Sequence, residues 1–499
     1  MNNKFFNNLL FFLVFLIFTL FIRYYTSSYE VITWDEATYI IAGREVLMGF
    51  LPYESLYEMK PPLLYYMYSI PLFFSQSLEA IRIYGIINIA ISSFLIFYIL
   101  KEYIKKNHSI LAALSFASVM NYYFWLDTSS EIVALPFILI SYIFFKNHEK
   151  SNINLFLSGI FISISTLIRL NIAYLVIFMV FFLIIKKIKI KKKIREIFLF
   201  GISGLIPLIF IIIIYYKQDL ISLLYAGMVE VSLAYSSENS FLIGIYKYMK
   251  TIYKLCYFNP FPFLILTILF IFMIFKKSLL EKDNKYLILF ISGIMFSILI
   301  TGQGFSHHLI LIIPFIVIFI FSKLINSKLL IFIRNLIISI IIIIPLYLSI
   351  APNISLLEND FDVRENHQLR NLSKLIDNSN TKILALDYHL VYFYSNIPHP
   401  FKLIHTPALA RKTTKNRLMP LQNIGYYNEN YIDKAFSPDY EYILCSTRIC
   451  IEGRPNIENK KIKNLLKNYE IIKTINNFSR WEHTKIGNLL LYKKIKKSD

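Results

Sequence analysis

The chain has 499 residues, 56% of them hydrophobic, and a mean hydropathy of +0.54. A soluble core of this length does not need so many apolar residues, so the composition argues against a soluble fold. The net charge of +20 could suggest nucleic acid, but much of the Lys and Arg lies in short segments between apolar runs. That placement is typical of membrane topology, so we predict a membrane protein with no nucleic-acid partner.

Long uncharged apolar runs recur through the first 350 residues. A helix needs about 20 such residues to cross a hydrocarbon layer of about 30 Å, and in lipid it satisfies its own backbone polar groups. The stretch 153–185 fits either two helices or one broken helix. No small-residue cleavage site follows the first run, so it is expected to be a retained helix. We predict about eleven transmembrane helices, at 5–26, 81–100, 109–125, 132–146, 153–169, 171–185, 197–216, 259–275, 286–301, 307–322 and 329–350.

Lys and Arg cluster in alternate loops, at 101–106, 146–150, 186–195, 276–285 and 323–328. The positive-inside rule places these loops, and with them the N-terminus, in the cytoplasm. Eleven crossings then leave the C-terminal tail outside. The richness in Ile, Lys and Asn favours an AT-rich microbial genome, so we expect a multi-pass protein of the bacterial plasma (inner) membrane.

Three segments on the expected outer side are not spans: 27–80, 217–258 and 351–499. We predict a transmembrane domain over 1–350, with outer loop 27–80, and a soluble α/β domain over 351–499. The fold class is then an all-α polytopic membrane protein with a C-terminal α/β domain.

Within the tail, patterning predicts strands at Lys382–Asp387 and Tyr440–Cys445, an apolar patch at Leu390–Tyr394 and helix within Ile462–Tyr469. Cys445 and Cys450 are near enough in sequence to form a disulfide in an oxidising compartment, or they are two free thiols.

The first outer segment carries the most informative motif. Apolar residues at helical spacing between positions 37 and 48 predict an amphipathic helix at the membrane surface. Asp35 and Tyr39 are four residues apart, so they share one face of it. Thr33 and Glu36 have capping-box spacing, which favours a cap over catalysis for Glu36. The motif reads Thr33-Trp-Asp-Glu-Ala-Thr-Tyr, then Gly43-Arg44-Glu45, Pro52-Tyr53 and Lys60-Pro61-Pro62-Leu63.

This pattern resembles the first outer loop of the protein mannosyltransferase and aminoarabinose transferase superfamily, which has the GT-C fold. The motif resemblance covers about residues 34–66, and hydropathy and the outer tail extend it loosely over the chain. It implies a membrane glycosyltransferase whose donor is a sugar on a polyprenyl phosphate. It also implies that Asp35 is the catalytic acid/base residue and that Lys60 contacts the carrier phosphate. Thr38 stands where Arg is common in aminoarabinose transferases, so the resemblance does not specify that particular donor.

The chemistry of these residue types agrees with the resemblance. An acceptor hydroxyl is a poor nucleophile until a base such as Asp35 takes its proton. The leaving polyprenyl phosphate is already negative, so it needs cations more than an acid; Lys60 could supply one and Arg44 a second. One carboxylate and direct attack imply inversion at the anomeric carbon. The alternatives are an interfacial Lys60, and for Arg44 an ion pair with Glu45 or a headgroup contact.

Four further polar residues lie at expected outer ends of spans. Glu131 could orient the acceptor, bind a divalent ion with Asp35, or merely start a helix, which we favour. Arg169 could neutralise the donor phosphate or anchor to lipid headgroups. His307 and His308 could bind a phosphate or a metal, or be satisfied at the interface, and adjacent histidines alone do not define a metal site. A divalent metal cofactor therefore stays open.

Two other functions are compatible with many spans. A lipid-carrier flippase or transporter would typically place charges at mid-membrane and lack a large outer tail. An O-antigen ligase or polymerase would rely on long later outer loops. The acids of this chain cluster in outer loops, which favours transfer to a lipid, glycan or protein acceptor at the membrane surface. Release of free polyprenyl phosphate from donor and acceptor would discriminate among the three.

A reporter fused after Asp499 is expected to be active only on the non-cytoplasmic face, because eleven crossings carry the chain there from a cytoplasmic N-terminus. The measurement is compartment-specific activity of the fusion. A cytoplasmic reporter would mean that an odd number of spans has been miscounted.

Overall fold

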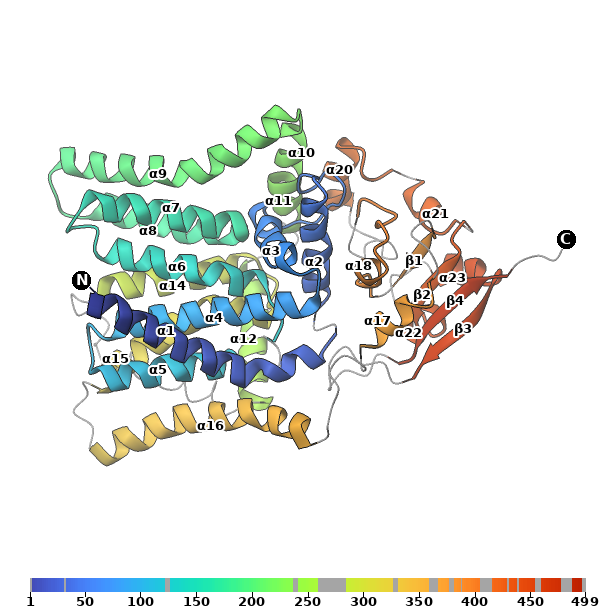
Figure 1. Ribbon diagram of the computed structural model, residues 1–499. Helices are drawn as coiled ribbons and strands as arrows, with labels where there is room; N and C mark the ends of the chain where they lie inside the picture. Colours follow the sequence, from blue (N-terminus) through green and yellow to red (C-terminus); the bar gives the residue numbers. More distant parts are fainter. Residues whose placement is uncertain are drawn as a thin grey trace. The chain divides into compact units, whose positions relative to one another are not determined.

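The computed structural model describes residues 2–30, 33–121, 126–236, 241–258, 284–325, 331–358, 367–376, 381–386, 388–403, 415–428, 430–437, 439–453, 459–476 and 487–495. These residues are mostly helical, with one small sheet (Figure 1). They form two compact units. The first comprises Met1–Thr26, Arg82–Ile213 and Ser236–Phe361, and the second comprises Ser27–Ile81, Ile214–Tyr235 and Asp362–Asp499.

The first unit is helical throughout its described part. Its helices lie side by side, α6 against α7, α8 against α14 and α5 against α16 (Figure 1). Its elements, including the ends of α4 and α9 that fall in the second unit, are α1 (Asn2–Arg23), α4 (Leu78–Leu100), α5 (Lys106–Val119), α6 (Ser130–Lys146), α7 (Asn152–Ile168), η3 (Leu170–Ile172), α8 (Ala173–Ile185), α9 (Ile190–Lys217), α12 (Phe241–Phe258), α14 (Lys285–Ile300), η8 (Ser306–Leu311), α15 (Ile313–Ile325) and α16 (Ile331–Glu358).

Three helical segments of the described residues are long and apolar enough to cross a membrane: Phe5–Ser27, Leu78–Leu100 and Ile190–Lys217. The predicted span 259–275 lies outside the described residues, and each of the others overlaps a helix of the first unit. Several of these helices are shorter than a full span, so the number of crossings and their orientation stay predictions.

The stretch 153–185 forms two helices. The first, α7, ends at Arg169, whose backbone is extended with φ −146° and ψ 104°, and α8 begins at Ala173 after the single turn η3. The break therefore coincides with the polar Arg169 and Asn171 that interrupt the apolar run.

The second unit takes in parts of all three segments that were expected outside the membrane. Its sheet has the order β1-β2-β4-β3, with β1 parallel to β2 and the other pairs antiparallel. Its elements are α2 (Trp34–Leu47), α3 (Leu63–Phe74), α10 (Ile221–Tyr225), η4 (Ala226–Glu230), α11 (Val231–Ser236), α17 (Gln368–Ser373), β1 (Ile383–Ala385), α18 (Val391–Tyr394), α20 (Lys415–Asn423), α21 (Tyr431–Ala435), β2 (Tyr442–Ser446), α22 (Thr447–Cys450), α23 (Asn459–Leu466), β3 (Tyr469–Ile475) and β4 (Leu489–Lys494); η1 (Tyr24–Ser28) joins it to α1.

The tail follows much of its predicted pattern. The strands β1 and β2 lie where strands were predicted and are fully buried, and α23 lies where helix was predicted. The helix ends at Leu466 because the chain turns into β3 at Tyr469. Of the two alternatives left open for the tail cysteines, the structure has the disulfide. It joins Cys445 at the end of β2 to Cys450 in α22, with the two Cα atoms 6.2 Å apart, a separation that disulfides accept.

The predicted surface helix is present as α2, but the expectation of amphipathicity was wrong. Every residue from Glu36 to Glu45 is buried. The polar side is covered by the tail, because Thr38 Oγ1 lies 2.9 Å from His389 Nε2 and Arg44 bonds to tail carbonyl groups. Another side of α2 packs closely against α3. Glycine is needed there at position 43, since a Cβ would lie 2.9 Å from Tyr68 Cβ.

A buried carboxylate also holds the tail to the first outer segment. Glu30 accepts hydrogen bonds from the backbone N–H of Leu369 at 2.7 Å and of Arg370 at 2.8 Å, and so caps the start of α17. Burial raises the pKa of Glu30 to about 7, although these two bonds act to lower it.

The stability of the second unit should therefore fall as the pH rises from about 4.5 to about 7. The folded protein holds the Glu30 proton more tightly than the unfolded chain does, so this stabilisation is complete below the unfolded pKa and is lost as the pH passes through the folded pKa. The measurement is the thermal unfolding midpoint of purified protein across this range. Glu30→Gln should lack this part of the pH dependence, whereas Glu470→Gln, a matched change on exposed β3, should keep it. Identical pH profiles for wild type and Glu30→Gln would contradict the assignment.

Candidate functional site

The first turn of α2 carries Asp35. The helix begins after Thr33, whose backbone is extended and whose Oγ1 accepts a hydrogen bond from the Glu36 backbone N–H at 3.2 Å. This is one half of the predicted capping box, and the Glu36 side chain is almost completely buried. Asp35 is only partly buried, and the Tyr39 phenol lies 3.5 Å from its Oδ2, as their shared helix face predicts.

Tyrosine side chains connect Asp35 to the main chain at Lys60. The Tyr39 ring lies 6.5 Å from the Tyr65 ring, measured between centroids. The Tyr65 phenol in turn donates to the carbonyl oxygens of Glu58 at 3.0 Å and Lys60 at 3.3 Å. The packing of α2 against α3 thus fixes both residues of the motif on one scaffold.

The loop that precedes α3 is held from a second side. Tyr53 adopts a left-handed backbone (φ 74°), and its phenol donates to the Lys60 carbonyl oxygen at 2.5 Å. Its ring leaves no room for a side chain at Gly227, where a Cβ would lie 2.9 Å from Tyr53 Cδ2. Burial raises the pKa of both Tyr53 and Tyr65 well above the ordinary value, so both phenols stay protonated and can donate. A strained residue that persists under such packing is common at functional sites.

The Lys60 side chain is partly exposed, and none of the ion pairs among the described residues includes it. A lysine whose main chain is fixed and whose ammonium is not already paired is suited to bind an anion.

Arg44 lies in a different environment. It is 1% exposed, and it donates to the carbonyl oxygens of Tyr392 at 2.8 Å and Ile397 at 3.3 Å. Its ion pair with Glu45, at 3.4 Å, is the structural alternative considered above. These contacts favour a role in attaching α2 to the tail, and a substrate contact by Arg44 remains only a prediction.

A second polar group lies within the first unit, around Glu131 at the start of α6. Arg169 Nη1 lies 2.7 Å from Glu131 Oε1, and both side chains are more than nine-tenths buried. Ser130 Oγ connects them, since it donates to Glu131 Oε2 at 3.0 Å and accepts from Arg169 Nη1 at 2.8 Å. Glu131 is thus both the helix-start acid that we favoured and the counter-ion of Arg169.

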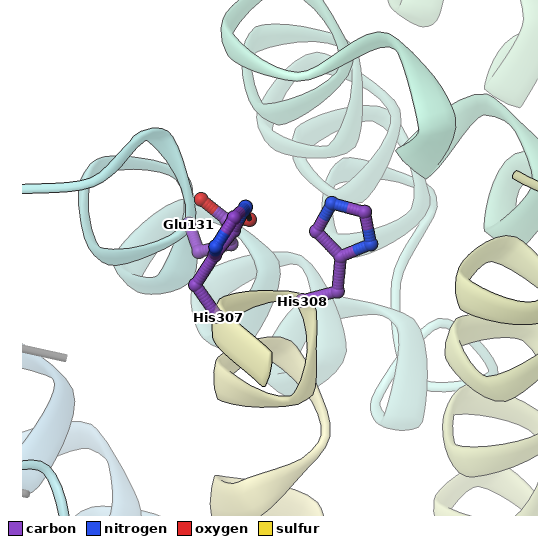
Figure 2. A group of neighbouring side chains, drawn as sticks. All are labelled: Glu131, His307 and His308. Atoms are coloured by element: carbon purple, nitrogen blue, oxygen red, sulfur yellow. Dashed lines mark ion pairs between the residues drawn. The ribbon is translucent and has the colours of Figure 1, made fainter. Parts of the chain in front are cut away.

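Both histidines of η8 join this group. His307 Nε2 lies 3.6 Å from Glu131 Oε1, and Figure 2 shows His307 beside that carboxylate, with His308 next along the chain. His308 Nδ1 is hydrogen-bonded to the Tyr248 phenol of α12. Ligand atoms of Glu131, His307 and His308 all lie within 4.8 Å of one another, so among the described residues these three could hold a metal ion.

Sequence reasoning missed the residues that position these groups. Ser130, Tyr248, Tyr53 and Tyr65 act through contacts with residues elsewhere in the fold. Ser130 carried a weak signal as the neighbour of Glu131 at a helix start. Tyr53 and Tyr65 lie within the motif, but no role was assigned to them, and Tyr248 is one of 36 tyrosines in the chain and carried no signal.

A family model described as dolichyl-phosphate-mannose-protein mannosyltransferase matches residues 59–216. The solved structure of ArnT from Cupriavidus metallidurans bound to undecaprenyl phosphate has the same fold, with a TM-score of 0.64, 8% identity and 97% of each chain covered. Its apo form matches with a TM-score of 0.60 and 8% identity over 96% of this chain and 97% of that one. No curated protein matches the sequence significantly.

The chain has the fold of ArnT, and within residues 59–216 it also matches the protein mannosyltransferase family model in sequence. Both findings agree with the resemblance predicted from the first-loop motif. The range matched by the family model includes Lys60, Glu131 and Arg169, while Asp35 precedes it. At 8% identity the likeness to ArnT establishes the fold, and the roles of individual residues stay predictions.

Arg169→Met should destabilise the first unit, because it would leave the Glu131 carboxylate buried without its counter-ion. Breaking a buried pair in this way typically costs about 3–5 kcal/mol. The measurement is the thermal unfolding midpoint in detergent, with exposed Arg195→Met as control. Adding Glu131→Gln to Arg169→Met should recover most of the loss. Equal midpoints for Arg169→Met and Arg195→Met would contradict a stabilising ion pair.

Proposed function

We propose that this protein transfers a sugar from a polyprenyl-phosphate donor to an acceptor outside the cytoplasm, with inversion at the anomeric carbon. The acceptor is a lipid, a glycan or a protein hydroxyl. Two findings support the donor class: the family model is named for a dolichyl-phosphate-linked sugar, and ArnT with the same fold was solved with undecaprenyl phosphate bound.

The observation that carries the proposal is the tyrosine-mediated link between Asp35 and Lys60. It joins a partly exposed carboxylate, and an ammonium group that forms no ion pair with the described residues, to the packed helices α2 and α3. A base for the acceptor and a cation for the leaving phosphate are the two groups that this reaction needs from the protein.

The proposed reaction is a single displacement. Asp35 accepts the proton of the acceptor hydroxyl while the hydroxyl oxygen forms a bond to the anomeric carbon of the donor. The bond from that carbon to the phosphate oxygen breaks, and its electron pair leaves with the polyprenyl phosphate, whose charge Lys60 stabilises. Attack from the face opposite the leaving group inverts the anomeric centre. No covalent enzyme intermediate forms, so a second carboxylate is not required.

Arg169 is proposed as an anion-binding cation of the first unit, oriented by Glu131 and Ser130. Its Nε is buried and makes no hydrogen bond within the described residues. A buried donor without a partner is costly in the free protein and is a suitable contact for an incoming anion.

Asp35→Asn should lower the rate of sugar transfer by about 10²–10⁴-fold, because it keeps the size of the side chain and removes its basicity. Lys60→Ala should mainly raise the KM for the donor, because it removes a phosphate contact. Glu36→Gln should have a milder effect, of about 1 kcal/mol on helix stability, if Glu36 mainly caps α2. The measurement is transfer to acceptor together with release of free polyprenyl phosphate.

All variants are compared at equal expression and equal thermal stability, with Asp219→Asn as the same chemical change on an exposed loop. Normal transfer by Asp35→Asn together with an inactive Glu36→Gln would move the base to Glu36. Normal transfer by both variants would exclude the mechanism, and movement of intact donor across the membrane without its cleavage would favour a flippase.

A further inference from the structure

We propose that Glu131, His307 and His308 bind a divalent transition-metal ion, with Zn²⁺ as the best match. The inference goes beyond the proposed function and does not depend on it. One ligand comes from the first turn of α6 and two come from η8, a distant segment of the chain that packs against α6 within the first unit. Their candidate ligand atoms lie within 4.8 Å of one another.

The donor set selects the kind of metal. Two imidazoles and one carboxylate form a set that binds Zn²⁺ in enzymes and leaves a fourth position for water or substrate. Mg²⁺ and Ca²⁺ prefer oxygen ligands, so two nitrogen donors disfavour them. Neither His307 nor His308 belongs to a sequence pattern for zinc; the third ligand is supplied only by the fold.

The surroundings position two of the three ligands. The Ser130 hydroxyl donates to Glu131 Oε2 at 3.0 Å, and the Tyr248 phenol is hydrogen-bonded to His308 Nδ1. When Nδ1 carries the proton and donates it to Tyr248, Nε2 carries the lone pair that a metal requires. Such outer contacts orient metal ligands and fix the histidine tautomer.

Metal binding requires a modest contraction of the cluster. Ligand atoms around tetrahedral zinc lie about 3.3 Å apart, as follows from bonds of about 2.0 Å. The His307 side chain is 29% exposed and can turn toward the ion, whereas Glu131 is 1% exposed and already held in place. His307 is therefore the ligand expected to move.

Arg169 makes the site dependent on an anion. It lies 2.7 Å from Glu131 Oε1 and neutralises that carboxylate when no metal is bound. A bound dication next to this pair would leave excess positive charge in a buried place, which is unfavourable unless the fourth position takes an anion. Phosphate should therefore strengthen zinc binding, because its oxygen atoms can contact both the ion and the guanidinium group.

The test uses the full chain, purified in detergent without a polyhistidine tag, loaded with zinc and desalted. Elemental analysis should find about one zinc per chain, and titration should show tighter binding with inorganic phosphate present. His307→Ala and His308→Ala should each weaken zinc binding by more than about 100-fold. Tyr248→Phe should weaken it by about 10–100-fold, as expected for loss of a contact that orients a ligand.

His108→Ala, which changes a histidine elsewhere in the first unit, controls for adventitious binding and should keep the full zinc content. Each variant is accepted only if its thermal unfolding midpoint without zinc equals that of the wild type. Glu131→Gln is expected to fail this criterion because of Arg169, so the two histidine variants decide the outcome. Absence of zinc from the wild type, or a full zinc content in both histidine variants, would overturn the proposal.

Discussion

Every charge buried in a chain that is 56% hydrophobic must find its partner within the protein. Glu131 pairs with Arg169, Arg44 binds carbonyl oxygens of the tail, and Glu30 binds two backbone N–H groups at the start of α17. Each contact joins segments that are distant in the sequence but lie within one unit. The contacts of Arg44 and Glu30 attach the tail to the first outer segment. The pair of Glu131 and Arg169 joins the start of α6 to the end of α7.

In the first outer segment, the residues with structural contacts are buried, whereas the candidate catalytic residues are partly exposed. Glu36 and Arg44 lie in the same motif as Asp35, but both are almost completely buried, and Arg44 donates to a carbonyl oxygen of the tail. Asp35 and Lys60 keep partly exposed side chains, while the tyrosines around them hold the main chain. A carboxylate and an ammonium group that are fixed in position but still accessible are what a transfer reaction at a membrane surface requires.

The likeness to ArnT at 8% identity has a physical explanation. In lipid, almost any long apolar run satisfies the requirement for a spanning helix, so the helices can exchange Ile, Leu, Phe and Val freely while the fold persists. Identity is then needed only where chemistry or a buried charge restricts the residue. A family model can therefore match residues 59–216 although the chain as a whole is only 8% identical to ArnT.

The sequence by itself indicated the membrane class, the positions of most helices and the tail strands β1 and β2, because hydropathy and strand patterning are local properties of the chain. Its first-loop motif also gave the resemblance to the superfamily. The sequence also identified Glu131, Arg169 and the two histidines as candidates, but not Ser130, Tyr248 or Glu30. Only the tertiary structure decided which of these residues meet. The Glu131–Arg169 ion pair, the approach of His307 and His308 to Glu131, and the burial of both faces of α2 depend on contacts between residues far apart in the chain. No local pattern encodes such contacts, because they follow from how the helices pack.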